Sequence, residues 1–338
     1  RFRNVTGVQT CALPIYFLMT KFDIIYCEKL LNNVQYTMTA ESHRMVPFES
    51  GNIYVHSITN NNDRALIILP GRSMSARNFW HFDPGTGVTH AEQLVHAGID
   101  VYMIDALGFG NSTGGVRPTY DRLYFAEQVS TVLYSMPRYE QVSCLGFCNT
   151  TAVPLVLLAQ GWLDSAVVMS PTIFDSTWCV NNPAMVRLWQ RMATESGFWS
   201  TSLDLFIEQQ LTKISDTEIG TPQRVDSWFT EMQRLTQGYT SYNNGQWQAP
   251  RTWWLDRIQW PMAHDNFGFD IAMLNGKRIL FTRGEYDVEV PQDWFDRACA
   301  YFTNAQVQTY IIPGCTHFAL WEHGYQTAVD RIIDFVQA

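Results

Sequence analysis

One strand–turn–helix segment constrains the fold of this chain more than any other feature. The run Gln141–Phe147 is strand-like, and the apolar run Thr151–Ala159 is helix-like. The turn between them reads Gly146-Phe147-Cys148-Asn149-Thr150, so a cysteine stands where a strand gives way to a helix. A thiol held at the positive end of a helix ionises more easily than a free thiol. The segment therefore predicts a nucleophilic cysteine, Cys148, at the carboxyl end of a buried strand.

Two loops downstream carry the partners that such a nucleophile needs. The strand-like run Arg278–Thr282 is followed by Arg283-Gly-Glu-Tyr-Asp-Val-Glu-Val-Pro291, which contains Asp287. A second strand-like run, Val307–Ile312, leads into Pro313-Gly-Cys-Thr-His-Phe318, which contains His317. A nucleophile is activated by a base that a third group orients, so these loops are candidates for the acid and the base.

Two upstream segments complete the pattern. Ala65–Gly71 is a strand that ends in Pro70-Gly71, and Val101–Ser112 is a strand followed by a turn rich in glycine. With the three segments above, they resemble the five motifs of the α/β-hydrolase fold superfamily, in the order nucleophile, acid, histidine. The resemblance covers roughly residues 50 to 335. It implies a mostly parallel central sheet flanked by helices, with an inserted, mainly helical cap.

The resemblance also assigns roles to residues. It implies that Cys148 is the nucleophile, His317 the base and Asp287 the acid. The oxyanion hole would be formed by the backbone N–H groups of Asn149 and Arg72. The segment at Gly71 departs from the family, which usually has His-Gly where this chain has Pro-Gly.

Rival residues exist for two of these roles. Asp293, Asp265 and Glu285 are alternative acids, and His264 and His323 are alternative bases that fit the family pattern less well. A further group of residues in the glycine-rich turn is interpreted as structural, because glycines there serve a tight turn: Asp105, Gly108, Gly110 and Ser112.

Two branches of the superfamily that use cysteine share features with this chain. Dienelactone hydrolases are similar at the nucleophile but are smaller and lack a long insertion. Polyhydroxyalkanoate synthases carry G-[YF]-C-x-G, of which Gly146-Phe147-Cys148 matches three positions, and Val95–Asp105 is also similar to their sequence. The chain departs from both at Thr150, where the family has glycine.

Residues 172–268 interrupt the alternation of strands and helices and are predicted to form the cap. The runs Met185–Met192, Ser202–Leu211 and Asp226–Leu235 have helical apolar spacing. Eight of the twelve tryptophans lie in this segment: Trp178, Trp189, Trp199, Trp228, Trp247, Trp253, Trp254 and Trp260. Most would pack the cap itself, but some should line an apolar acyl pocket. Phe147, Trp178 and Trp254 are the predicted substrate-binding residues.

Composition restricts the partners. The net charge of −9 argues against a nucleic-acid or anionic-membrane surface, and no apolar run reaches membrane-spanning length. Seven cysteines without paired spacing indicate free thiols and a reducing, cytoplasmic location. No cluster of cysteine and histidine has metal-ligand spacing, so we expect no metal and no cofactor. The expected partner is a small-molecule acyl substrate.

The expected organisation has three parts. Residues 19–171 and 269–338 form the hydrolase core, and residues 172–268 form the cap. Residues 1–18 are interpreted as a leader that is non-native or disordered, because Arg1–Ile15 resembles translated sequencing-adapter read-through from metagenomic reading frames. Met19 is then a plausible start. The alternative for this segment is a signal or transit peptide, although a proper apolar region and a cleavage site are missing.

Three functions are consistent with these residues. The first is an acyl hydrolase that acts on an ester, lactone or thioester through a Cys-His-Asp triad. The second is an acyltransferase or synthase that uses the same triad on a carrier or coenzyme A thioester. The third is a catalytically silent binding protein on the same fold. A complete triad favours the first two over the third.

Overall fold

In the computed structural model, the residues described are 39–49, 51–71, 75–114, 122–172, 187, 198–202, 242–243, 246–250, 268–322 and 324–338. The chain divides into two compact units, Arg1–Met38 and Thr39–Ala338, and all described residues lie in the second. The predicted leader therefore lies outside the described residues.

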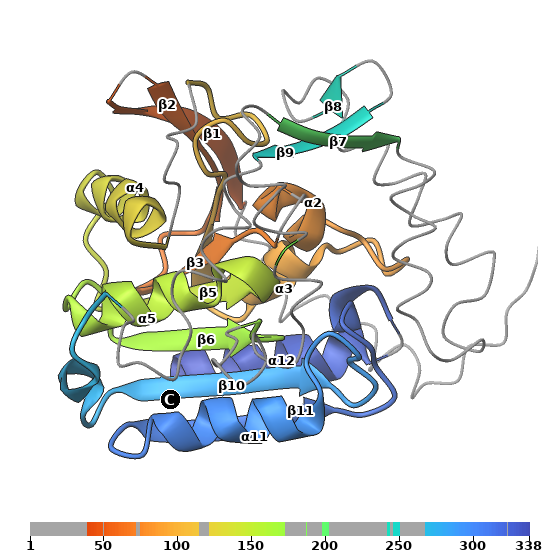
Figure 1. Cartoon of the computed structure of the whole chain (residues 1–338). Coiled ribbons are helices and arrows are strands. Elements are labelled where there is room, and N and C mark those ends of the chain that lie inside the picture. The colour runs from red at the N-terminus through yellow and green to blue at the C-terminus, as the bar shows by residue number, and fades with distance from the viewer. Residues whose placement is uncertain are drawn as a thin grey trace, which may run out of the picture. The chain divides into compact units, whose positions relative to one another are not determined.

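An eight-stranded sheet organises the second unit, with the strand order β1-β2-β4-β3-β5-β6-β10-β11 (Figure 1). In this order, neighbouring strands from β4 to β11 pair in parallel. By contrast, β1 pairs with β2, and β2 with β4, in antiparallel fashion. The bounds are β1 Ala40–Phe48, β2 Gly51–Thr59, β3 Arg64–Leu69, β4 Ile99–Ile104, β5 Gln141–Phe147, β6 Ser165–Met169, β10 Arg278–Gly284 and β11 Gln306–Ile312. The mostly parallel sheet predicted from the sequence is confirmed.

Helices cover both faces of this sheet, because its inner strands are apolar on both sides. One core cluster joins the sheet to α4, α5 and α11, and the other joins it to α3 and α12. Adjacent residues of β3 alternate between the clusters, with Ile67 in the first and Leu66 in the second. The helices are α2 Ala76–Trp80, α3 His90–His96, α4 Arg122–Tyr134, α5 Ala152–Ala159, α11 Gln292–Tyr301 and α12 Tyr325–Gln337.

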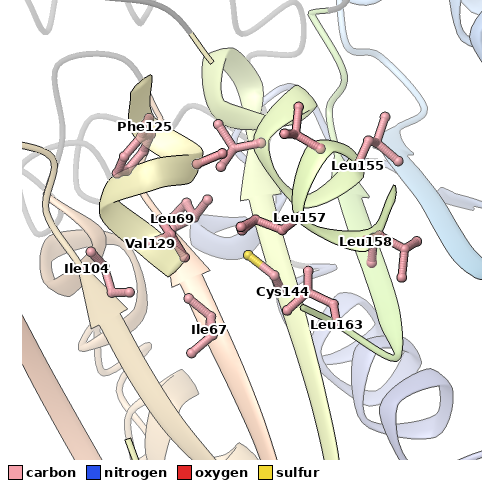
Figure 2. Close-up of a cluster of buried hydrophobic side chains, with 14 of the residues drawn as sticks. Ile67, Leu69, Ile104, Phe125, Val129, Cys144, Leu155, Leu157, Leu158 and Leu163 are labelled. Atoms are coloured by element: carbon pink, nitrogen blue, oxygen red, sulfur yellow. The ribbon is translucent and has the colours of Figure 1, made fainter. Parts of the chain in front are cut away.

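Figure 2 shows part of the first cluster, in which Ile67 of β3 and Cys144 of β5 lie with Val129 of α4 and Leu157 of α5. All four side chains are completely buried. Burial of this apolar surface fixes β5 and α5 against each other. It therefore also fixes the turn between them, which holds Cys148.

The insertion contains structure that the sequence did not predict. Its described residues include β7 (Phe198–Ser202), β8 (Tyr242–Asn243) and β9 (Gln246–Pro250), which form a three-stranded antiparallel sheet in the order β7-β9-β8. Ser202, expected to begin a helix, is the last residue of β7. The Asn244-Gly245 dipeptide between β8 and β9 is a common hairpin signal.

Most residues of the helices predicted in the insertion lie outside the described part of the chain. Arg187, within the predicted helix Met185–Met192, is helical. The other predicted helical runs lie outside the described residues, apart from Ser202. Among the residues described, no helix is both long enough and apolar enough to cross a membrane.

Candidate active site

The turn that holds Cys148 is strained. Strand β5 ends at Phe147, a single 3₁₀ turn spans Cys148–Thr150, and α5 follows. Cys148 has a φ of +54°, in the left-handed region that side chains other than glycine rarely adopt. A Cβ added at Gly146 would lie 2.6 Å from the carbonyl oxygen of Thr150. Glycine is therefore needed at 146, because the chain folds back on itself there.

Thr150, which stands where the superfamily has glycine, is accommodated by hydrogen bonds. Its hydroxyl accepts a hydrogen bond from the backbone N–H of Phe147 and donates one to the carbonyl of the same residue, both at 3.2 Å. The Thr151 hydroxyl donates to the carbonyl of Cys148 at 2.7 Å. The hydroxyls of the two threonines thus stabilise the turn through hydrogen bonds to its own backbone. The elbow therefore forms with threonine in place of glycine at position 150.

The acid loop follows β10 and holds Asp287 in place. Oδ1 of Asp287 accepts hydrogen bonds from the backbone N–H groups of Glu289 at 3.0 Å and Val290 at 3.1 Å. The buried guanidinium of Arg283 donates to three carbonyls of the same loop, those of Gly284, Glu285 and Val290. Arg283 therefore fixes the course of the loop, and the two N–H groups fix the carboxylate.

The histidine loop follows β11 and places His317 beside that carboxylate. Nδ1 of His317 lies 2.9 Å from Oδ2 and 3.0 Å from Oδ1 of Asp287. The sulfur of Cys148 and a ring nitrogen of His317 lie within 4.8 Å of each other. The structure thus brings together Cys148, His317 and Asp287 from β5, β11 and β10, all at the carboxyl edge of the sheet. They are 5%, 2% and 2% exposed.

A second carboxylate, Glu289, also reaches His317. Its Oε2 lies 3.5 Å from Nε2 of His317, on the side of the ring away from Asp287. Burial lowers the pKa of His317, but the charges of Asp287 and Glu289 and the neighbouring Cys148 outweigh it, so the pKa is raised well above 6.5. The imidazolium form is thereby stabilised beside the thiol. Glu289 was not predicted as a site residue, although it lies two residues after Asp287.

Close packing joins the two loops. A Cβ at Gly284 would lie 2.1 Å from the carbonyl oxygen of Thr316, so glycine is required where the acid loop crosses the histidine loop. The buried carboxylate of Glu322 accepts hydrogen bonds from the N–H of Thr316, at 2.6 Å, and from its hydroxyl. Neither Glu322 nor Thr316 was predicted, because both act only through the position of the neighbouring His317.

Of the residues predicted for the oxyanion hole and for substrate binding, the structure describes only Asn149 and Phe147. Asn149 directly follows Cys148 in the 3₁₀ turn, which is the position that contributes an N–H to the oxyanion hole in this fold. The ring of Phe147 packs against the ring of His317, with centroids 5.1 Å apart. A Cβ at Gly71 would lie 2.6 Å from the ring of Phe147, so the two segments are in close contact. Arg72, Trp178 and Trp254 lie outside the described residues.

Of the alternative acids and bases, the structure describes only Asp293 and Glu285, and each has a different partner. Asp293 lies in the first turn of α11, where its largely exposed carboxylate pairs with Arg297. Glu285 accepts a hydrogen bond from the N–H of Gly314. Asp265, His264 and His323 lie outside the described residues.

The glycine-rich turn after β4 has the structural role expected of it. Gly108 and Gly110 have φ angles of +71° and +55°. The buried carboxylate of Asp105 accepts hydrogen bonds from the N–H groups of Asn111 and Ala76, and Ser112 donates to the carbonyl of Asp105. This turn therefore holds the start of α2, next to the predicted oxyanion segment.

Four of the seven cysteines lie in the described part of the chain, and none of these four forms a disulfide: Cys144, Cys148, Cys299 and Cys315. Cys144 is completely buried within β5, and burial raises the pKa of its thiol well above 9. It should therefore be inert.

Two groups in the described residues offer sets of ligand atoms within 4.8 Å of one another. One is Cys148, Glu289 and His317 in this site, and the other is Glu41, His56 and His81. Neither has a sequence spacing that marks a metal site, because each set is assembled from distant segments.

Comparison with known proteins places this chain in a family. The family model described as "Alpha/beta hydrolase family" matches residues 66–331. An esterase from Exiguobacterium antarcticum has 14% identity and a TM-score of 0.60, with 88% of this chain and 100% of that chain covered. The thioesterase domain from the curacin biosynthetic pathway has 13% identity and a TM-score of 0.59, with the same coverage.

A third solved structure, E-2-(acetamidomethylene)succinate hydrolase, has 15% identity and a TM-score of 0.58, with 88% and 100% coverage. At these identities the likeness concerns the fold alone. A comparison with curated protein sequences gave no match.

Proposed function

Because the chain belongs to the alpha/beta hydrolase family, we propose that it is an acyl hydrolase that uses Cys148 as its nucleophile. One observation carries the proposal: the Cys148 sulfur, on a strained elbow, lies within 4.8 Å of a His317 ring nitrogen whose ring is held by Asp287. In this family a nucleophile at the elbow, paired with a histidine after the last strand, acts in acyl transfer.

The proposed reaction begins with the thiol. Nε2 of His317 takes the proton of Cys148, and the charges of Asp287 and Glu289 stabilise the resulting imidazolium. The thiolate attacks the carbonyl carbon of the substrate, and the oxyanion accepts a hydrogen bond from the N–H of Asn149 and, by position, from that of Arg72.

The tetrahedral intermediate then collapses to an acyl-thioester on Cys148. The leaving alkoxide or thiolate takes the proton from His317. A water molecule then gives its proton to His317 as it attacks the thioester, and the second collapse returns the thiol and releases the carboxylic acid.

The nucleophile restricts the substrate class. A thiolate leaves more readily than an amide nitrogen, so an intermediate formed from an amide tends to collapse backwards. Esters, lactones and thioesters are therefore better substrates than amides for this site. The predicted partner is accordingly a small acyl compound.

We also propose a cytoplasmic location for the protein, because the described cysteines form no disulfide, as is usual in a reducing compartment.

Acyl transfer is the second candidate function. The triad residues are no more than 5% exposed, which limits the access of bulk water to an acyl-thioester. Amines and thiols also react well with thioesters, so a bound acceptor would compete with water.

Product analysis tests both candidates. The purified chain is incubated with a panel of acyl esters, lactones and acyl-thioesters, with and without added amine or thiol acceptors. Free acid as the main product in both arms supports hydrolysis, whereas acylated acceptor at the expense of free acid supports transfer. No turnover of any member beyond the Cys148→Ala background would leave the silent binding protein as the remaining function.

A further inference from the structure

A group of histidine and glutamate side chains lies apart from the triad, at the edge of the sheet formed by β1 and β2. Glu41 comes from β1, His56 from β2, and His81 is the residue that ends α2. His43 of β1 pairs directly with His56, so Glu41, two residues away, lies on the same face of the sheet as His56. Three separate segments thus converge on one point.

The distances fit a single bound ion. Nε2 of His56 lies 3.1 Å from Oε1 of Glu41, and Nδ1 of His81 lies 4.0 Å from the same oxygen. The two imidazole rings are 5.4 Å apart between centroids and inclined at 75°. All three ligand atoms lie within 4.8 Å of one another. Zinc bound by nitrogen and oxygen at about 2.0–2.2 Å places its ligand atoms at comparable separations.

The state of His56 supports a ligand role. His56 is 3% exposed, and its contact with Glu41 is short but not aligned as a hydrogen bond, so neither ring nitrogen makes a hydrogen bond to the described residues. A buried polar group without a hydrogen bond is costly.

We propose that Glu41, His56 and His81 bind a divalent transition-metal ion of the zinc type. Two imidazoles and one carboxylate are a set that zinc accepts with an open fourth position. Glu41 is half exposed, which leaves a path for the ion from solvent. A bound ion would link β1, β2 and α2, and α2 begins directly after the predicted oxyanion segment. The charge of Arg77, which acts on His56, opposes the binding of a cation and should weaken it.

The test uses the full chain in the Cys148→Ala background, because that change removes the thiolate of the other ligand group. The metal-free protein is titrated with Zn²⁺ in a calorimeter, and with Co²⁺ while visible absorption is recorded. We expect one ion per chain and cobalt d–d bands without a thiolate charge-transfer band. Zn²⁺ should also raise the melting temperature, because it binds only the folded site.

Single variants assign the binding to these residues. Glu41→Gln changes a half-exposed side chain, so the protein should fold, and zinc affinity should fall by at least about 10-fold. His81→Ala should have a similar effect, whereas Arg77→Gln should tighten binding. The matched control is Glu127→Gln, an exposed carboxylate on α4, which should leave the affinity unchanged. Failure of the parent protein to bind Zn²⁺, or equal binding by Glu41→Gln, would overturn the proposal.

Discussion

At the scale of single residues, the candidate site differs from a simple triad by one side chain. Glu289 places a second carboxylate 3.5 Å from the Nε2 side of His317, while Asp287 holds the Nδ1 side. The imidazole thus lies between two negative charges. An incoming substrate meets the Glu289 carboxylate beside the sulfur it must approach, so the charge of the acyl group should influence reactivity.

The first prediction concerns this charge. Glu289→Gln should raise kcat/KM for esters with a carboxylate in the acyl group, relative to neutral esters of equal size, by about 10-fold, because it removes a repulsive charge. The ratio of the two kcat/KM values is the measurement, and added salt should reduce the difference between the proteins. An unchanged ratio would show that Glu289 does not face the acyl group.

The second residue-scale prediction concerns the thiol of Cys144 in β5 and that of Cys148, directly after β5. Cys148 should react with an alkylating probe at neutral pH, well below the ordinary thiol pKa, because the His317 imidazolium stabilises its thiolate. His317→Ala should shift the pH profile of labelling towards that of a free thiol. Cys144→Ala is the matched control and should leave the labelling unchanged. Loss of labelling in Cys144→Ala alone would mean that the reactive thiol has been misassigned.

At the scale of elements, the position of the nucleophile depends on the joint between β5 and α5. Gly146 allows the close approach, and the hydroxyl of Thr150 bonds to both backbone groups of Phe147. A glycine at 150 could not make these bonds. Where the superfamily has glycine, this chain therefore has a residue whose side chain stabilises the turn.

Thr150→Val should loosen this joint. The variant removes the hydroxyl but keeps the shape, which leaves the buried N–H of Phe147 without that partner and should cost about 1–3 kcal/mol. Thermal unfolding measures the loss, and Thr150→Ser, which keeps the hydroxyl, is the control. Equal stabilities of the valine and serine variants would contradict the assigned role.

A second element-scale prediction concerns the turn after β4. Burial raises the pKa of Asp105 to about 6 from an ordinary 3.8, so the folded protein holds a proton that the unfolded chain has lost. This contribution is complete below about pH 4 and declines as pH rises to about 6, by about 3 kcal/mol. Denaturant unfolding over this range should show the decline, and its absence in Asp105→Asn would identify the residue. Parallel curves for the two proteins would refute the assignment.

At the scale of the whole molecule, β3, β4, β5, β10 and β11 were predictable because each is an apolar run bounded by a loop motif, whereas β1 and β2 were not predicted. The same runs located Cys148, Asp287 and His317, since parallel strands present their carboxyl ends at one edge. The supporting residues were not predictable, because Arg283, Glu322 and Thr316 act through contacts between segments.

The insertion shows where periodicity fails. Strands β7 and β9 are only five residues long, and their mixed polar and aromatic sequences match no single period. The Asn244-Gly245 dipeptide was the available signal for the hairpin, and counting helical spacing alone missed it. The Glu41, His56 and His81 group was hidden for a different reason, because its members meet only after β1, β2 and α2 have packed.

The central claim, that Cys148 carries the acyl group, is tested most directly by mass spectrometry of the intact protein during turnover of an activated ester. The parent protein should gain the mass of one acyl group, and peptide mapping should place it on Cys148 as a thioester that hydroxylamine removes. Cys148→Ala should gain no such mass. Turnover with an acyl group on another residue, or undiminished turnover by Cys148→Ala, would contradict the account.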